Sequence, residues 1–374
     1  MKGKKNILFI ANSLHFGGAE KHVVSLLNGL NDKKFNQFLC CLKDDKSLLP
    51  QIQKDRVKDI CFLHVSHKLD LNSIRKLANY IYNKKIDIVV CINQYPMIYG
   101  LLAEKIARKS AKVIVIFHRT LIYKFKDRLQ LLLYRFFFKR CDCVVFVSKN
   151  QGKYWLNEKH LKTKKTVVIQ NGIDCNYFDF KLNGDQRRQL LQQLNFSNID
   201  YIVGLCGTLR HEKFHIDGIE AIEKVRKKGL NVKFLIIGDG PERERIEQHI
   251  SKKGLENVVA ITGFQEDVRP FIVLCSCMII TSHSETFSIA ALESMNMGKP
   301  MIMTDIGGAS EQIEHGKTGF LYQKGDIESL ANYILKLSSQ VLRKQMGSEA
   351  LKSVRKSYSL EKMLNNYEEL FQVL

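Results

Sequence analysis

The sequence predicts an α/β protein with two domains, each built on a parallel sheet that helices cover on both faces. Short apolar strands alternate with helical patterns in both halves of the chain, which is typical of such sheets. The length of 374 residues exceeds what one compact core usually holds. The turn Asn171–Asp174 separates the two alternating sets. We therefore expect domains at residues 1–172 and 173–357.

The elements of the first half follow from its apolar runs. Strands are expected at residues 6–11, 35–42, 87–93, 111–118 and 166–170, with helices from residue 19 and at 71–83 and 99–108. Gly17 and Gly18 stand between the first strand and its helix, where glycine lets backbone N–H groups come close to a phosphate. His118 ends a strand at the edge where such sheets bind ligands.

The second half repeats the pattern. Strands are expected at residues 201–207, 232–237, 258–263 and 277–282, with helices at 217–228, after the turn at 238–241, and from the turn after 282 to the stop at 298–300. Every strand ends in a polar or glycine-rich turn. This arrangement places candidate ligand-binding groups at the carboxyl edge of the second sheet.

Two glutamates eight positions apart, Glu285 and Glu293, mark the strongest candidate site. They flank a strand-to-helix turn whose backbone N–H groups, near Thr286, Phe287 and Ser288, are expected to attract phosphate at the helix N-terminus. A carboxylate accepts two hydrogen bonds at once and therefore suits a vicinal diol. Two diol-binding groups beside an anion site indicate a nucleotide-sugar pocket.

The formal net charge of +20 is unevenly distributed. Residues 1–170 contain 33 Lys and Arg against 12 Asp and Glu, whereas residues 171–374 contain 25 against 26. Such asymmetry favours contact between the first domain and a polyanion, and an anionic membrane surface is one candidate. The basic, aromatic stretch at 123–142 fits either an interfacial helix or a core-packing helix. No nucleic-acid-binding motif occurs, so we expect a membrane surface and no nucleic acid as partner.

Composition also bears on the compartment. No apolar run reaches the ~18–20 residues of a membrane span, and the N-terminal residues fit a first strand better than a signal peptide. The ten cysteines are scattered, mostly inside apolar strands and without the spacing of a zinc site. Buried reduced thiols are the expected state. We therefore expect a cytoplasmic protein that lies peripherally on the inner face of the cell membrane.

The stretch around the two glutamates resembles the E-x7-E motif of the retaining glycosyltransferases of family 4. Thr286 replaces the usual glycine of that motif, and Asn296 replaces an alanine. Further resemblances run in order along the chain, from Gly17 to Gly319. The matching positions of the motif are Glu285, Phe287, Glu293, Met295, Gly298 and Pro300, and the other matching segments are Gly17–Glu20, Asn171–Asp174, Gly238–Pro241 and Gly307–Glu311.

The resemblance implies a GT-B fold, in which two Rossmann-like domains hold the active site in the cleft between them. It also implies that the first domain, 1–172, binds the acceptor, that the second, 173–357, binds the nucleotide-sugar donor, and that a C-terminal helix, about residues 358–374, packs back on the first domain. The family moves a sugar from a nucleotide sugar to an acceptor and retains the anomeric configuration, usually without a metal. We therefore expect a UDP- or GDP-linked donor, a glycan or lipid-linked acceptor, and neither cofactor nor metal.

The resemblance assigns roles residue by residue. It places Glu293 on the ribose, Lys213 on the diphosphate and Glu285 on the sugar hydroxyls. Thr208 stands where the family has an arginine, and Arg210, two positions later, is expected to supply that charge. A cation is needed there because the leaving nucleoside diphosphate gains negative charge. The remaining expected donor contacts are Gly17, Gly18, His118, Asp239, Gly240, Thr286, Phe287 and Ser288.

Two alternatives remain open. Nucleotide-sugar epimerases and phosphorylases use the same pair of domains for different chemistry. A non-catalytic membrane-bound scaffold would keep the basic stretch and bind no nucleotide. Such a scaffold has no need of both glutamates and the phosphate-site cations, so a transferase is favoured.

Overall fold

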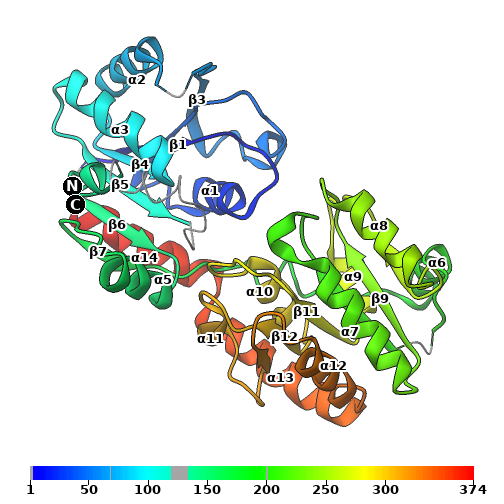
Figure 1. Cartoon of the computed structure of the whole chain (residues 1–374). Coiled ribbons are helices and arrows are strands. Elements are labelled where there is room, and N and C mark those ends of the chain that lie inside the picture. The colour runs from blue at the N-terminus through cyan, green and yellow to red at the C-terminus, as the bar shows by residue number, and fades with distance from the viewer. Residues whose placement is uncertain (1–2, 68, 119–133, 199–200) are drawn as a thin grey trace. The chain divides into compact units, whose positions relative to one another are not determined.

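The computed structural model describes residues 3–67, 69–118, 134–198 and 201–374. The chain forms two compact units (Figure 1). The first unit comprises Met1–Asn171 together with Leu360–Leu374, and the second comprises Gly172–Ser359. The sequence placed this boundary after residue 172. No helix within the described ranges is both long and apolar enough to cross a membrane.

The first unit is built on a seven-stranded parallel sheet with the strand order β3-β2-β1-β4-β5-β6-β7. The chain starts in the middle of the sheet, and the strand order reverses between β1 and β4. Ligands bind at such a switch point in open α/β sheets. The strands are β1 (Lys5–Ala11), β2 (Phe35–Cys41), β3 (Val57–Phe62), β4 (Ile88–Ile92), β5 (Lys112–Phe117), β6 (Cys143–Phe146) and β7 (Thr166–Val168).

Helices cover both faces of this sheet, because successive strand residues point to opposite sides. Leu8 and Ile10 of β1 face the core formed with α2 and α3, and Phe9 between them faces Phe371 of α14, with ring centroids 6.5 Å apart. The helices are α1 (Gly18–Gly29), η1 (Leu49–Gln51), α2 (Leu71–Asn83), α3 (Gln94–Ala107), α5 (Lys149–Lys153), η2 (Tyr154–Glu158) and α14 (Leu360–Val373).

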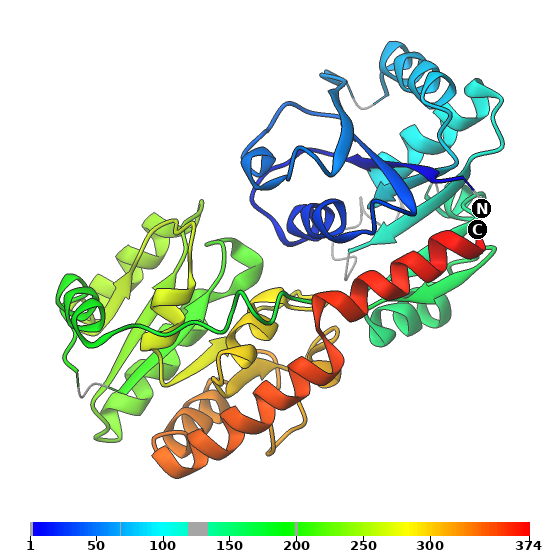
Figure 2. The ribbon, with the colours of Figure 1, turned by 180° about the vertical axis from the view of Figure 1, so that it is seen from behind.

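The last helix of the chain, α14, belongs to the first unit and is drawn in red in Figure 2. Phe371 also packs against Phe35 of β2, with ring centroids 6.0 Å apart. Lys5 at the start of β1 donates from Nζ to the carbonyl oxygen of Phe371 at 3.0 Å, which satisfies a free carbonyl at the helix end. Contacts from two strands therefore hold the end of the chain in this unit.

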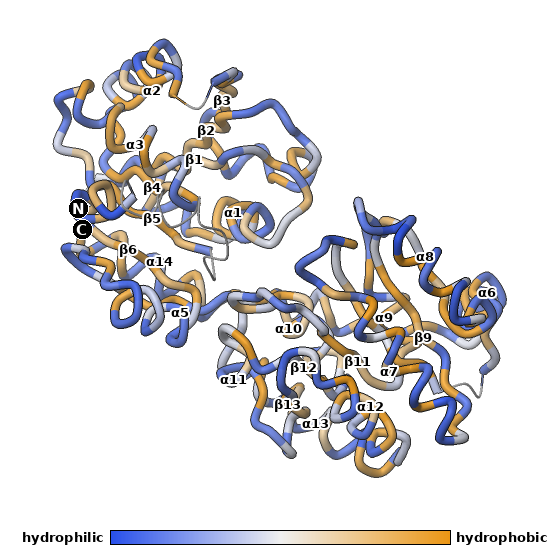
Figure 3. Tube along the Cα trace, viewed as in Figure 1, coloured by the Kyte–Doolittle hydropathy of each residue, from blue (hydrophilic) through white to orange (hydrophobic). Residues whose placement is uncertain are grey.

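The second unit repeats the architecture with a six-stranded parallel sheet in the order β10-β9-β8-β11-β12-β13. Its strands are short and almost entirely buried, as expected for a sheet covered on both faces. Figure 3 shows these strands, for example β9 and β11, as hydrophobic segments. They are β8 (Tyr201–Cys206), β9 (Val232–Ile237), β10 (Val259–Ile261), β11 (Cys277–Ile280), β12 (Met301–Thr304) and β13 (Gly319–Tyr322).

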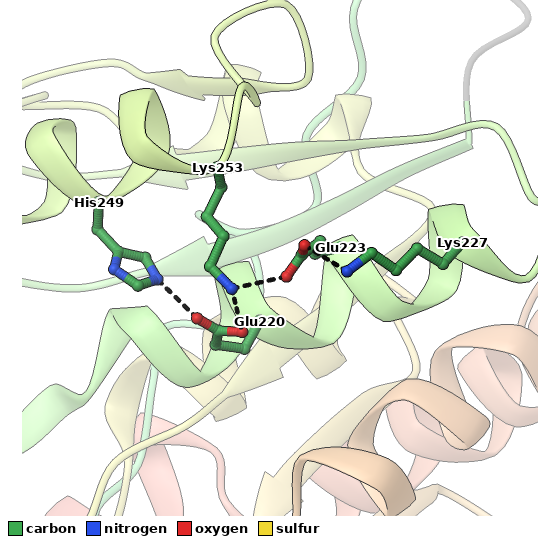
Figure 4. Close-up of polar contacts among 5 residues, drawn as sticks. All are labelled: Glu220, Glu223, Lys227, His249 and Lys253. Atoms are coloured by element: carbon green, nitrogen blue, oxygen red, sulfur yellow. Dashed lines mark hydrogen bonds and ion pairs between the residues drawn. The ribbon is translucent and has the colours of Figure 1, made fainter.

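The helices of the second unit connect these strands. A network of five polar side chains ties the first crossover helix, α7 (His215–Lys227), to the end of the second, α8 (Arg243–Lys252), and to Lys253 after it (Figure 4). Lys253 donates to Glu220 at 2.9 Å and to Glu223 at 2.8 Å, and Lys227 with Lys253 holds the pKa of Glu223 at about 2. The helices are α6 (Gly184–Gln193), η3 (His211–Lys213), α7 (His215–Lys227), α8 (Arg243–Lys252), α9 (Arg269–Leu274), α10 (Ile289–Asn296), α11 (Ala309–Gln312), α12 (Ile327–Lys336) and α13 (Gln340–Ser357).

The prediction of two Rossmann-like parallel sheets is confirmed. The helix expected at 99–108 begins earlier, at Gln94, because Pro96 falls in its first turn, where a missing N–H costs no intrahelical bond. The strand β3 was not predicted. Its partner β2 shifts register beside it, and only its first residue is fully buried, so it lacks the continuous apolar run of the central strands.

The structure describes only the end of the basic stretch at 123–142, because residues 123–133 lie outside the described residues. Residues 134–138 are helical. Phe138 is buried against Phe117, with ring centroids 5.1 Å apart, whereas Phe136 is 53% exposed with the Arg140 guanidinium over its ring. The described end of this stretch therefore packs Phe138 into the core, with Tyr134 and Phe137 partly buried against it, and leaves Phe136 at the surface.

Candidate active site

The expected donor-site residues of the second unit lie on the segments that follow β8, β9 and β11 at the carboxyl edge of the sheet, with Glu293 on helix α10. These loops touch through their backbones. Gly240 has a φ of +158°, and a Cβ there would stand 2.6 Å from the carbonyl oxygen of Leu209. Gly307 has a φ of +54°, and a Cβ there would collide with the carbonyl oxygen of Glu285. Close backbone packing therefore fixes the position of the loop that carries Glu285.

Lys213 and Glu285 form an ion pair at this edge, with 2.5 Å between Nζ and Oε2. Their side chains are 28% and 18% exposed, so the pair is half-buried and reachable from solvent. Lys213 ends the single turn η3, and its carbonyl oxygen accepts from Oγ1 of Thr281 at 2.8 Å. The pair joins residues 72 positions apart in the sequence. A cation and a carboxylate are thus placed side by side at the start of α7.

The loop after β11 is further fixed against the start of α7. The His283 ring stacks on Phe214, with centroids 3.3 Å apart and planes 12° apart. Its Nε2 lies 2.9 Å from Oδ2 of Asp217. His215, the first residue of α7, is buried, and that burial together with Lys213 lowers its pKa to about 4. The His215 imidazole is therefore neutral at pH 7.

Two backbone N–H groups at the N-terminus of α10 donate to side chains of the same unit. Ser288 caps the helix through Oγ, which accepts from Ala291 N at 3.3 Å. Gln312 clamps the same residue, accepting from Ser288 N at 3.1 Å and donating to its carbonyl oxygen at 2.8 Å. The Ser288 N–H, which the sequence suggested for a phosphate, is therefore already bonded within the unit. Gln312 was not predicted, because nothing in its local sequence marks it as a partner 24 residues away.

Glu293 lies in the second turn of α10 and is 7% exposed. Thr286 and Phe287 before the helix are 7% and 4% exposed. The Phe287 ring packs on the edge of Tyr358 at 5.4 Å. Glu293, Thr286 and Phe287 are therefore all buried within the second unit.

The loops after β8 and β9 carry the remaining expected donor residues. Arg210 is exposed, and its backbone N–H donates to the Thr208 carbonyl oxygen at 2.8 Å. Asp239 holds its own turn: Oδ1 accepts from Gly240 N at 2.8 Å, and Oδ2 accepts from Arg243 at 3.0 Å. The Asp239 carboxylate is therefore engaged by α8, whereas the Arg210 side chain reaches solvent beside η3.

The expected first-unit residues lie at the carboxyl edge of the other sheet. Gly17 is the extended residue before α1, with a φ of −160°, and it packs against the Glu20 carboxylate. Glu20 is 8% exposed and lies 3.4 Å from Nδ1 of His15. Gly18 opens the helix with no atom near the place of a side chain. The turn is therefore compact at Gly17 and open at Gly18.

His118 follows β5 and faces a second histidine, His22 of α1, with ring centroids 5.0 Å apart. His22 Nδ1 lies 3.0 Å from Asn171 Oδ1, and its Nε2 lies 3.1 Å from the Tyr367 hydroxyl. Burial lowers the pKa of His22 to about 4, and burial together with His22 lowers the pKa of His118 well below its usual value. Both rings are therefore neutral at pH 7.

His22 was not predicted as part of the site. It stands within the apolar run of α1, next to Val23 and Val24, and the sequence pattern gave it no separate signal. No group of three or more His, Cys, Asp or Glu suited to a metal occurs among the residues that the structure describes.

Comparison with known proteins covers both units. Residues 16–177 match the family model described as Glycosyltransferase Family 4, and residues 186–353 match the model described as Glycosyl transferases group 1. N-acetyl-alpha-D-glucosaminyl L-malate synthase from Bacillus anthracis is 29% identical over an alignment of 308 residues that covers 81% of this chain and 78% of that protein.

Two further proteins extend the comparison. The UDP-Gal:alpha-D-GlcNAc-diphosphoundecaprenol alpha-1,3-galactosyltransferase of Escherichia coli is 21% identical over 81% of this chain and 79% of its own length. The crystal structure of HepE from Anabaena with UDP-glucose superposes with a TM-score of 0.86 at 24% identity, over 99% of this chain and 100% of that one. The predicted GT-B fold is thereby confirmed.

Proposed function

Because this chain belongs to the glycosyltransferases of family 4, we propose that it transfers a sugar with retention from a UDP- or GDP-linked donor to a glycan or lipid-linked acceptor. The ion pair between Lys213 and Glu285 carries this proposal. It sets a phosphate-binding cation beside a hydroxyl-binding carboxylate at the carboxyl edge of the second sheet.

The donor is bound by the second unit in this proposal. Lys213 neutralises the diphosphate, and the exposed Arg210 on the same loop adds the charge that Thr208 lacks. Glu285 accepts hydrogen bonds from the transferred sugar, and the buried Glu293 accepts them from the ribose. Fixed charges aimed at the departing diphosphate stabilise the transition state more than the ground state, so these cations accelerate the chemical step.

The first unit contributes neutral groups. His118, uncharged at pH 7 because burial lowers its pKa, serves as a hydrogen-bond partner of the donor sugar and not as a cation. The departing phosphate oxygen accepts the proton of the acceptor hydroxyl on the same face of the sugar, so no side chain has to act as a general base. This proposed chemistry requires neither metal nor cofactor.

The first experiment is a donor screen that measures nucleotide release from UDP- and GDP-sugars with crude lipid and glycan acceptors, with and without EDTA. The UDP-glucose complex of HepE and the UDP-galactose transferase of Escherichia coli make UDP-sugars the first donors to test. We expect acceptor-dependent release that EDTA leaves unchanged, and a product with the donor's anomeric configuration by NMR. Release or epimerisation that needs no acceptor would instead indicate an epimerase or phosphorylase. Failure to bind any nucleotide would indicate a scaffold.

We also propose that the basic first unit holds the protein on the inner face of the cell membrane. The charge asymmetry and the exposed Phe136–Arg140 pair support this. The full chain should sediment with vesicles containing about 30 mol% anionic lipid and remain soluble with neutral vesicles at about 150 mM salt. Replacing Lys139 and Arg140 by glutamine should weaken retention more than replacing Lys252 and Lys344. Equal retention of both double variants, or none by the native protein, would contradict the proposal.

A further inference from the structure

Two cysteines face each other at the edge of the first unit's sheet. Cys40 of β2 and Cys61 of β3 are register partners in this parallel strand pair, so their side chains point to the same face of the sheet. Among the strands that the structure describes, they are the only cysteines paired with each other across neighbouring strands. All ten cysteines of the chain lie within the described residues and are free thiols.

The strand pair brings the two thiols within reach of a disulfide. Neighbouring strands lie about 4.8 Å apart, and a disulfide joins Cα atoms that are about 4.4–6.8 Å apart. Both side chains lie in one packing environment, because Cys40 is part of the core formed with α2 and α3, and Cys61 packs against that core. An S–S bond between them is therefore compatible with the backbone of the two strands as it stands.

The two thiols differ in their access to solvent. Cys40 is fully buried, whereas Cys61 is half-buried. β3 is the outermost strand of the described sheet and has β2 as its one neighbour there (Figure 1). A small oxidant can therefore reach Cys61 from solvent, whereas the core shields Cys40.

The acidity of the two thiols differs in the same sense. Hydrogen bonding from the Cys40 thiol lowers the pKa of Cys61, and the charge of Lys84 adds to this effect, whereas burial and Asp59 oppose it. The same hydrogen bond and burial raise the pKa of Cys40. The thiolate is the form of cysteine that attacks an oxidant. Cys61 is therefore the reactive member of the pair, with the protonated Cys40 beside it.

We propose that Cys61 is a modification site for hydroperoxides and that Cys40 joins the oxidised Cys61 in a disulfide between β3 and β2. The pair is reduced at rest, and the disulfide closes residues 40–61 into a covalent loop at the sheet edge. This chemistry is independent of sugar transfer, because it involves neither nucleotide nor acceptor.

The modification takes place in two steps. The Cys61 thiolate attacks the terminal oxygen of the hydroperoxide and the O–O bond breaks. The alkoxide takes up the proton that the thiol released, and Cys61 becomes a sulfenic acid. The Cys40 sulfur then attacks the Cys61 sulfur, the S–O bond breaks, and the oxygen leaves as water with the Cys40 proton. Two thiols and one hydroperoxide thus give one disulfide, one alcohol and one water, and a dithiol restores both thiols by exchange.

The test uses the full chain, reduced and then freed of reductant, with a small molar excess of hydrogen peroxide. Remaining thiols are blocked with N-ethylmaleimide, and peptide mass spectrometry locates each modification. We expect a disulfide between the peptide of Cys61 and that of Cys40, which dithiothreitol reverses. Cys61 should be oxidised about ten-fold faster than Cys175, a half-buried thiol whose pKa is raised by burial.

Cys41 provides the matched control. It adjoins Cys40 in β2 but points to the other face of the sheet, so Cys41→Ala should form the disulfide as the native protein does. Cys40→Ala should instead stop at the sulfenic acid of Cys61, which dimedone traps, and Cys61→Ala should leave Cys40 reduced. The fluorescence of the buried Trp155 verifies that the first unit of each variant is folded.

The native protein decides the inference even where a variant fails to fold. Free thiols at both Cys40 and Cys61 after peroxide treatment, a disulfide made by Cys41, or cross-links between two copies of the chain would overturn it. Oxidation of Cys61 to a sulfinic acid without a disulfide would do the same. A disulfide that forms only in urea would also contradict the inference, because the strand register would then have no part in it.

Discussion

Lys213→Ala should lower kcat for sugar transfer about 10²–10³-fold, the usual cost of losing one group that stabilises transition-state charge. The affinity for the intact nucleotide sugar should change much less, because the charge that Lys213 meets grows only as the glycosidic bond breaks. Nucleotide release at saturating donor gives the rate, and calorimetry with the intact nucleotide sugar in the absence of acceptor gives the affinity.

The control for this substitution is Lys317→Ala, which removes an exposed lysine paired with Glu314 in the same unit. It should leave the rate within about two-fold. Lys213→Ala also leaves the carboxylate of Glu285 without its partner, so the double variant Lys213→Ala/Glu285→Gln should recover melting temperature but not activity. A native rate of turnover in Lys213→Ala would show that the ion pair between Lys213 and Glu285 plays no part in catalysis.

Gly307→Ala should lower the free energy of unfolding of the second unit by about 2–4 kcal/mol, the sum of a left-handed backbone penalty and a steric collision. The added Cβ meets the carbonyl oxygen of Glu285, so the loop must shift and transfer should fall together with stability. Calorimetric unfolding and nucleotide release measure the two effects.

Gly316→Ala provides the matched comparison. Gly316 has a φ of +81° with no atom near its Cβ position, so its alanine variant bears only the backbone penalty of about 1 kcal/mol. The only tryptophan, Trp155, is buried in the first unit. Its fluorescence therefore reports unfolding of the first unit and helps to distinguish that transition from unfolding of the second. Equal losses at Gly307 and Gly316 would show that the loop accommodates the methyl group, and that its position is not fixed by the close approach.

The fold was predictable from the sequence because the central strands are continuous apolar runs and the turns contain glycine. The helix expected at 71–83 has those bounds in the structure, since Asp70 caps it by accepting from Asn72 N and Ser73 N. By contrast, β3 lies at the sheet edge, where partial burial weakens the hydrophobic pattern. The start of α3 was misplaced because Pro96 was expected to precede the helix, whereas the first turn of a helix tolerates proline.

The site was predictable only as a set of residues and not as a set of contacts. The sequence assigned Lys213 and Glu285 to one donor but not to each other, because pairing across 72 positions depends on the crossover between β8 and β11. The Asp239–Arg243 pair has the i,i+4 spacing of a helix contact and was in principle readable. The roles of Glu293, His118 and Arg210 in catalysis remain predictions.

Helix α14 belongs to the first unit but is synthesised after the second unit, which affects the order in which the two units can fold. The strands of the first unit leave the ribosome first. Phe9 and Phe35 can pack on Phe371, and His22 can contact Tyr367, only after α14 has been made. Residues 172–359 are made in between, and they contain all six described strands of the second sheet. The second unit can therefore form its sheet before residues 360–374 are made, while the first keeps an open apolar face until they are available.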